Sequence, residues 1–442
     1  MKSSLTRLVL AAMLVLAAAM PAMALDATEY DMEKSVNTAL ANNPQIKSAQ
    51  SDVEAAEFNR KSAWAPFAPA LSSSYGYTLY DHKQTLKDSP LRDRHLYSAT
   101  LTLSQDIFTG FKNVSNYDKA KLEKATAEVS VSAQELDLTL AVQQAFLGLL
   151  KGREAVRSAQ DSITRLESQL KVTQAFYDVG LKPRLDVLQA EVNLAEAQDT
   201  LLKAQNEVAT QNTRLNTLLI IPVESDVRYV GDLTEVPFTY SLQDCLERAF
   251  RLRPDLSISQ TAIEIAKKSA DVTKSGLYPS VTGDANYNRQ GDDPAMNGYE
   301  HSSSGFSSWN VQVGASWSVF NWGETWYAWK KAQQAVRKAE LDLETLKQNV
   351  LYDVKTKHLS ILSAAERIKV ARKALDSAQE SYRMAVARYQ AQVGTNTDVL
   401  DGQANLSSAE AQLTEALADY KIALANLYVS IGMKNPTLLA AQ

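Results

Sequence analysis

The chain contains two stretches in which apolar and polar side chains alternate strictly. The stretches span 97–104 and 309–319, and neither contains a charged residue. A weaker alternating segment precedes each one, separated from it by a polar, charged loop. A period of two residues is the pattern of a β-strand whose two faces meet different surroundings. We therefore predict two β-hairpins, at about 70–108 and about 280–320.

Two other segments lack the residues that interrupt helices. The ranges 113–178 and 324–390 contain no proline and few glycines, so each is long enough for one helix of about 100 Å. The segment after each carries a heptad repeat, with large residues such as Val399 at one position and small residues such as Gly402 three residues later. This arrangement permits close knobs-into-holes packing. It predicts two pairs of antiparallel coiled-coil helices.

The same order of elements occurs in both halves of the chain, which indicates an internal repeat. Pro254 follows Pro44 by 210 residues, and Asp398 follows Asp186 by 212 residues, with Val-Leu after each Asp. We predict a signal peptide at 1–24, a first repeat at 25–220 (helix, β-hairpin, long helix, helix), a linker at 221–240, a second repeat of the same build at 241–432 and a C-terminal tail at 433–442.

The first residues predict export from the cytoplasm. Lys2 and Arg7 precede an apolar run, and Ala22–Ala24 is a small-x-small cleavage signal, as in a secretory signal peptide. The only cysteine, Cys245, lies far from the cleavage site, so we predict no lipid anchor. No later segment has the roughly 18 to 20 uninterrupted apolar residues of a membrane-spanning helix. If the exported protein enters a membrane, it does so as strands.

The composition excludes several functional classes. The 46 Lys and Arg against 51 Asp and Glu give a formal charge of −5, which argues against a nucleic-acid partner. One cysteine cannot form a disulfide framework or a metal site of several thiolates. The sequence has no phosphate-binding glycine loop and no nucleophile motif. We therefore predict that the protein is not an enzyme, and we assign no catalytic, cofactor-binding or metal-ligating residues.

The surroundings of the strands decide the fold class. A soluble sandwich would bury one strand face, but these strands contain few large aliphatic residues. In a membrane barrel, the apolar face meets lipid and the polar face meets water. Trp309 and Trp317 lie on the apolar face roughly 20 Å apart, as in two aromatic girdles, and Trp322 follows at the boundary. Because the smallest barrels have about eight strands, we expect two, three or four copies to share one barrel.

Several motifs carry a family resemblance. They are the helix starts at Asn-Asn-Pro44 and Leu-Arg-Pro254, the strand exits Phe108-x-Gly and Phe320-x-x-Gly, and the Asp-Val-Leu helical turns of both repeats. Together with the order of elements, they resemble the TolC-type outer-membrane efflux protein (outer membrane factor) family over nearly the whole mature chain. The resemblance implies a mainly α protein with a small transmembrane β part. Its homotrimer would form a 12-stranded β-barrel continued by a 12-helix α-barrel.

The resemblance also implies a location and partners. Family members are passive exit ducts in the outer membrane of Gram-negative bacteria, in contact with outer-membrane lipid and extending into the periplasm. They work with a periplasmic adaptor (membrane fusion) protein and an inner-membrane RND or ABC transporter. The expected function is thus an exit channel for efflux or type I secretion. The alternatives are a non-conducting outer-membrane scaffold or adhesin, and a soluble coiled-coil protein.

Carried over position by position, the family pattern assigns an entrance gate. Its residues are Asp186, Tyr389, Asp398 and Asp401, whose carboxylates would form a ring that favours cations. A purely structural role is the alternative for the aspartates, because an acid in the first helical turn stabilises the macrodipole by about 0.3 to 1 kcal/mol.

The turns between the paired helices are the expected adaptor contacts. They contain Gly180, Pro183, Gln392 and Gly394. Two of these depart from the family pattern. Gly394 stands where some members have a basic residue that latches the closed state, and Gln392 replaces the turn glycine that the first repeat keeps as Gly180.

Overall fold

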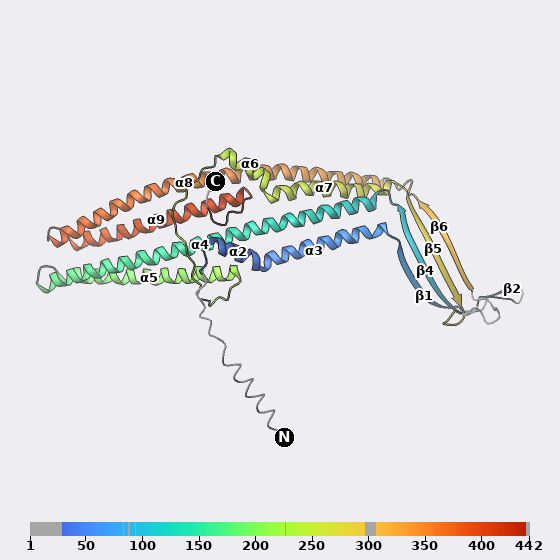
Figure 1. Ribbon diagram of the computed structural model, residues 1–442, viewed down its shortest axis with the longest axis horizontal. Helices are drawn as coiled ribbons and strands as arrows, with labels where there is room; N and C mark the ends of the chain where they lie inside the picture. The colour runs from blue at the N-terminus through green and yellow to red at the C-terminus, as the bar shows by residue number, and fades with distance from the viewer. Residues whose placement is uncertain are drawn as a thin grey trace, which may run out of the picture.

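The computed structural model describes residues 29–438 apart from 83, 87–88, 93, 226 and 297–305, and Figure 1 shows its elements. The predicted signal peptide lies outside the described residues. The first half contains α2 (Met32–Asn42), α3 (Pro44–Trp64), η1 (Ala65–Phe67), β1 (Ala70–Leu79), β2 (Gln84–Leu86), β3 (Ser89–Arg92), β4 (His95–Phe108), α4 (Lys112–Asp178) and α5 (Arg184–Leu219). The second half contains α6 (Leu242–Leu252), α7 (Pro254–Lys274), η2 (Ser275–Leu277), β5 (Ser280–Gly291), β6 (Phe306–Ser316), α8 (Glu324–Gln390) and α9 (Asn396–Ser430).

The two longest helices, α4 and α8, set the length of the molecule. Each has 67 residues, or about 100 Å, and their bounds differ from the predicted segments by at most one residue. At one end, α5 folds back along α4 and α9 along α8; at the other, α3 and α7 pack beside the long helices and lead into the sheet (Figure 1). The fold is therefore mainly helical with a small antiparallel sheet, built from two similar halves.

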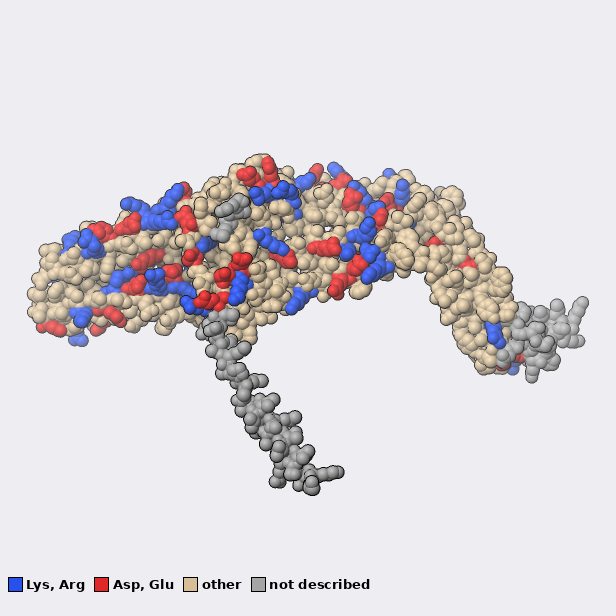
Figure 2. Space-filling view, in the orientation of Figure 1, with Lys and Arg blue, Asp and Glu red and all other residues tan. Residues whose placement is uncertain are grey.

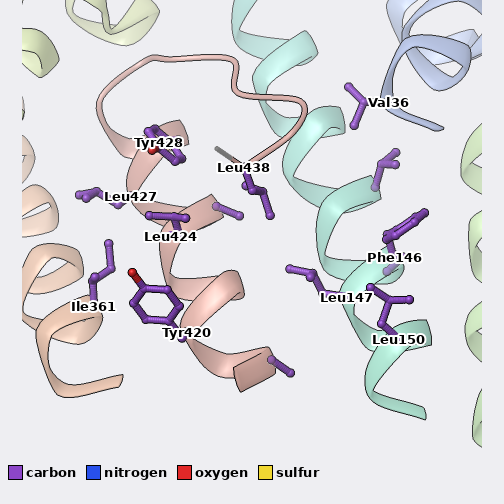
Figure 3. Close-up of a cluster of buried hydrophobic side chains, with 14 of the residues drawn as sticks. Val36, Phe146, Leu147, Leu150, Ile361, Tyr420, Leu424, Leu427, Tyr428 and Leu438 are labelled. Atoms are coloured by element: carbon purple, nitrogen blue, oxygen red, sulfur yellow. The ribbon is translucent and has the colours of Figure 1, made fainter. Parts of the chain in front are cut away.

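The largest buried cluster lies in the middle of the bundle. Figure 3 shows Phe146 of α4 and Leu424 of α9 in this cluster, together with Leu438 near the C-terminus. Their side chains are at most 2 % exposed. The connection between the halves contributes Tyr229, which is fully buried and donates a hydrogen bond from its hydroxyl to Asn216 Oδ1 at 2.7 Å. Because burying each large apolar side chain stabilises the fold by about 1.5 to 3 kcal/mol, this cluster ties both halves together.

The heptad positions have different surroundings in α5 and α9. In α9, Val399 and Leu406 are buried, and a Cβ on Gly402 would lie 3.4 Å from the Cα of Tyr382, so the small residue permits close approach to α8. In α5, the matching Val187 and Ala190 are also buried, but Leu194, which matches Leu406, is only partly buried. The reason is the number of neighbours, since α9 packs against both α8 and α4 whereas α5 packs mainly along α4.

The long strands form one antiparallel sheet in the order β1-β4-β5-β6. The β4–β5 pairing joins the two halves and places Leu101 opposite Tyr287, which in turn lies opposite Trp309. On the other face, Thr102 Oγ1 donates to Asn286 Oδ1 at 2.7 Å. The alternation seen in the sequence thus corresponds to one apolar and one polar face of the sheet.

The apolar face of the sheet is uncovered. Trp309, Val311 and Val313 are 76 %, 68 % and 69 % exposed. In Figure 2 the sheet carries very few Lys, Arg, Asp or Glu, whereas charged residues cover the helices. Uncovered apolar surfaces of this kind mark contact with a partner or with lipid.

No helix within the described part of the chain combines the length and the hydropathy needed to cross a membrane.

The end of β6 differs from the prediction. The alternating pattern continues to residue 319, but the strand ends at Ser316, so Trp317 lies beyond it. The physical reason is the pairing, because β5 begins at Ser280, directly opposite Ser316, and offers no partner further on. Trp317 instead donates from its indole Nε1 to the carbonyl oxygen of Leu277 at 3.2 Å.

The corners between strand and long helix have the same backbone shape in both halves. Gly110 and Phe111 have φ values of +60° and +68°, and Trp322 and Gly323 have +53° and +84°. Two consecutive left-handed residues thus form each corner. Glycine is the first of the two in the first half of the chain and the second of the two in the second half. Trp322 is 89 % exposed at this corner.

Candidate functional site at the tips of the two helical hairpins

The end of the bundle farthest from the sheet is formed by two short turns. Residues 179–183 connect α4 to α5, and residues 391–395 connect α8 to α9. Figure 1 shows both turns at the same end of the molecule. The sequence predicted functional residues in and beside these turns, and the structure brings side chains from the two hairpins into contact there.

In both turns, the second residue after the long helix has a left-handed backbone. Gly180 has φ +75°, and Gln392, which occupies the matching position, has φ +61°. A Cβ on Gly180 would meet nothing within 4 Å, so the backbone alone favours glycine there. A residue with a side chain costs about 1 to 2 kcal/mol in this conformation. The second turn therefore holds strain that the first turn avoids.

Tyr389 is fully buried at the end of α8. Its hydroxyl donates to Thr173 Oγ1 of α4 at 3.2 Å, and its ring lies 5.6 Å from the ring of Phe176. Burial is the main cause that raises the pKa of this hydroxyl; the hydrogen bond to Thr173 opposes the shift, and the charge of Asp186 adds to it. Tyr389 therefore acts as a neutral donor that links the two hairpins.

Asn396, the first residue of α9, is the centre of a buried polar network. Its Oδ1 accepts from Gln169 Nε2 at 2.8 Å and from Thr173 Oγ1 at 3.4 Å. Its Nδ2 donates to the carbonyl oxygen of Asp186 at 3.0 Å. Asn396 is 2 % exposed, and a buried polar group that loses its partner costs about 1 to 3 kcal/mol. One side chain thus joins α9 to both helices of the first hairpin.

Lys182 connects the two turns directly. Its Nζ donates to the carbonyl oxygen of Gly394 at 3.4 Å and lies 5.2 Å from the centre of the Tyr389 ring. A cation at this distance from an aromatic face is attracted to it. Gly394 has no side chain, so the cation at this contact between the turns comes from the first turn.

Asp398 caps the start of α9. Its carboxylate accepts from the Thr395 backbone N–H at 3.0 Å, while its own N–H donates to Thr395 Oγ1 at 3.1 Å. Hydrogen bonds from the backbone and the side chain of Thr395 lower the pKa of Asp398. This capping box gives the carboxylate a structural role, which is the alternative considered from the sequence.

The structure separates the predicted gate residues into two groups. Asp186 and Tyr389 belong to the buried network, Asp186 through its carbonyl oxygen. Asp398 and Asp401 are exposed on α9, one turn apart, where their charges face solvent.

Three residues of this network were not predicted from the sequence: Gln169, Thr173 and Asn396. A weak signal existed, since Asn396 directly follows the N-cap Thr395 at a position where an amide can reach a neighbouring helix. Lys182 was not predicted either. The prediction named its neighbour Pro183, which is the N-cap of α5.

Across the described ranges between 29 and 438, no group of three or more His, Cys, Asp or Glu side chains is arranged to hold a metal ion. Cys245 is buried in α6, where burial raises the pKa of its thiol to about 11.

The sequence is similar to a known protein family and to several of its members. The sequence profile of the family described as "Outer membrane efflux protein" matches residues 35–219 and 245–433. The alkaline protease secretion protein AprF of Pseudomonas aeruginosa is 26 % identical over 423 residues, covering 92 % of this chain and 85 % of AprF. The outer membrane protein TolC of Vibrio cholerae is 24 % identical over 401 residues, covering 90 % and 89 %.

Solved structures show the same fold. A membrane protein from Pseudomonas aeruginosa superimposes with a TM-score of 0.80 at 17 % identity, covering 92 % of this chain and 91 % of that one. The outer membrane protein VceC of Vibrio cholerae gives 0.78 at 17 % identity, covering 91 % and 96 %. With both segments of the family profile matched and the helix-and-sheet architecture shared, the chain belongs to the outer membrane efflux protein family.

Proposed function

We propose that this protein is the outer-membrane exit channel of a tripartite efflux or type I secretion system. The observation that carries the proposal is the sheet, whose apolar face is uncovered while its other face is polar. It continues into helices of about 100 Å, far longer than one globular domain needs. A duct that crosses a membrane and then the periplasm requires this combination.

Three copies complete the duct. Among the strands that the structure describes, β1 and β6 are the edges of the four-stranded sheet. Their unpaired backbone groups favour pairing with another strand. Pairing β6 of one copy with β1 of the next joins four strands from each of three copies into a closed barrel of twelve. The helices continue it as a tunnel.

The hairpin tips form the entrance of this duct. The network around Asn396 and the contact of Lys182 with Gly394 hold the two hairpins of one chain together, which keeps the entrance narrow. Asp398 and Asp401 from three copies then surround the axis and attract cations. Opening requires the two hairpins to part, so breaking these contacts enlarges the entrance.

The turns themselves are the contact points for a periplasmic adaptor, which connects the duct to an inner-membrane RND or ABC transporter. Gly180, Gln392 and Pro183 are exposed there, and Gly394 is half-buried between the turns. AprF is named as a secretion protein, and another relative, TtgC of Pseudomonas putida, is named as a probable efflux pump outer membrane protein. These names support both a secretion and an efflux context. The duct has no energy source of its own, so the transporter selects the cargo.

Conductance in planar bilayers tests the function. The purified trimer should conduct small cations in preference to anions, and Asp398→Asn with Asp401→Asn should reduce this preference. The matched control is Asp342→Asn with Asp376→Asn, which removes two exposed charges elsewhere on α8 and should leave selectivity unchanged. A trimer that inserts but does not conduct would refute the channel and favour a non-conducting scaffold.

A further inference from the structure

A pair of tryptophans lies just beyond the sheet. Trp326 and Trp329 occupy the first two turns of α8, with ring centres 5.0 Å apart and an interplanar angle of 63°. Trp326 is 46 % exposed. Indole rings have an apolar body and one polar N–H group, and they are enriched where a membrane meets water.

Two lysines surround this pair. The Nζ of Lys330 lies 5.0 Å from the centre of each ring, and the Nζ of Lys274, the last residue of α7, lies 5.7 Å from that of Trp329. Two ammonium groups, one from each helix, thus lie against one aromatic pair. Lys331, the next residue after Lys330 in α8, is exposed and adds a third positive charge to this end of the helix.

These lysines have no carboxylate partner among the described residues. Lys274, Lys330 and Lys331 form no salt bridge there, whereas Lys268, less than two turns earlier on α7, pairs with Asp118 at 2.7 Å. Repulsion between neighbouring cations is unfavourable unless an anion compensates it. The cluster therefore has the charge that an external anionic group would neutralise.

The acids nearest in sequence do not fill this role. Asp271 lies one turn before Lys274, and Glu324 lies in the first turn of α8, where it favours the helix dipole. Neither forms a salt bridge with a described lysine of the cluster.

The cluster continues the uncovered apolar surface. From Trp309 to Gly323 the chain contains no charged residue, and exposed Trp317, Phe320 and Trp322 lead from the sheet to α8. In Figure 2, basic residues begin on the helices close to the sheet. The order apolar, aromatic, basic matches the order of layers from the hydrocarbon core to the head groups of a membrane.

We propose that Lys274, Lys330 and Lys331, with Trp326 and Trp329, bind the phosphate groups of anionic phospholipids in the leaflet next to the helices. The ammonium groups contact the phosphate while the indoles cover the upper part of the acyl chains. This inference rests on the proposed function, because it takes the sheet to lie in the membrane. It adds that the channel prefers an anionic lipid at this depth.

Native mass spectrometry of the full-length trimer tests this preference. Trimers in detergent are titrated with phosphatidylglycerol or with zwitterionic phosphatidylcholine of the same chain length. The wild type should bind phosphatidylglycerol more tightly, and the triple variant K274Q/K330Q/K331Q should lose about tenfold in that affinity. The matched control K347Q/K355Q/K373Q removes three exposed charges farther along α8 and should bind as the wild type does.

Each other outcome overturns the inference in a distinct way. Equal binding of both lipids by the wild type, or equal affinity in the triple variant, shows that the lysines do not recognise the head group. Dissociation of the triple variant into monomers assigns the cluster to a contact between copies. Conductance of the same samples in phosphatidylcholine bilayers separates the two proposals, since a conducting wild type without lipid preference refutes this inference alone.

Discussion

The side-chain oxygen of Asn396 accepts a hydrogen bond from Gln169, a residue 227 positions earlier in the chain, at 2.8 Å. Asn396→Ala leaves the buried Gln169 amide and the Asp186 carbonyl without this partner, at a cost of about 1 to 3 kcal/mol. We expect the hairpins to part more often, which raises the single-channel conductance and the rate of hydrogen exchange around 169–173.

Asn193→Ala is the control for that substitution. The Asn193 amide bonds only within α5, to the carbonyl oxygen of Gln189, so its removal should leave the conductance unchanged. Unaltered conductance in Asn396→Ala as well would contradict a role of the network at the entrance.

Lys182→Gln removes the cation over the Tyr389 ring. An exposed cation–π contact is worth about 0.5 to 1 kcal/mol, and we expect a smaller gain in conductance than for Asn396→Ala. Lys182→Arg should restore the wild-type value because the guanidinium keeps the charge. Lys171→Gln, an exposed site on α4, controls for the loss of charge alone. An increase in the Lys171 variant of the same size would show that net charge, and not the contact, is responsible.

The turn residues offer a reciprocal pair of substitutions. Gln392→Gly relieves a left-handed backbone and should slow local opening of 389–396, whereas Gly180→Gln introduces the same strain and should speed opening of 177–184. The expected change is about 1 kcal/mol in each direction. Hydrogen exchange followed by mass spectrometry measures both, and changes of the same sign in the two turns would refute the explanation from φ.

The cap of α9 should respond to acid. Since hydrogen bonds from Thr395 lower the pKa of Asp398, its stabilising effect is complete above the unfolded value of about 3.9 and is lost as the pH falls through the lower folded value. Exchange protection of the first turn of α9, corrected for the intrinsic rate, should fall only below about pH 4. Asp398→Asn should abolish this dependence and Asp401→Asn should retain it. A dependence that persists in Asp398→Asn would assign it to another group.

The two sheet faces should differ in access to water. In a Cys245→Ser background, Thr100→Cys and Asn286→Cys on the polar face should react with a membrane-impermeant thiol reagent in bilayers. Leu101→Cys and Tyr287→Cys, at adjacent positions on the apolar face, should be protected. Equal reactivity of all four sites would exclude a membrane barrel with a wet interior.

The sequence was sufficient for the elements that depend on local patterns. Long segments without proline and with few glycines predicted α4 and α8. The period of two residues predicted that Leu101 and Thr102 lie on opposite faces of the sheet. These predictions were confirmed because many consecutive residues favour the same local backbone geometry. The predicted end of β6 was wrong because the strand ends where its partner β5 begins. The residues of β6 themselves do not specify that point.

The site could be predicted only in part. The turns and Asp398 carry local helix-start signals, but the contacts of Asn396 and Lys182 join segments more than two hundred residues apart. Buried polar contacts have no periodicity, and a single amide or ammonium does not specify which distant group it will meet. Such contacts can be identified only from a structure that contains both hairpins.

The sheet edges described above have a consequence for biogenesis. A newly exported copy presents the rims of β1 and β6, whose amide and carbonyl groups have only water to bond until a sister chain arrives. If a single copy entered the hydrocarbon layer, the backbone groups of β1 and β6 would lose their hydrogen bonds to water and gain none in return. Association of the chains must therefore precede, or accompany, their insertion.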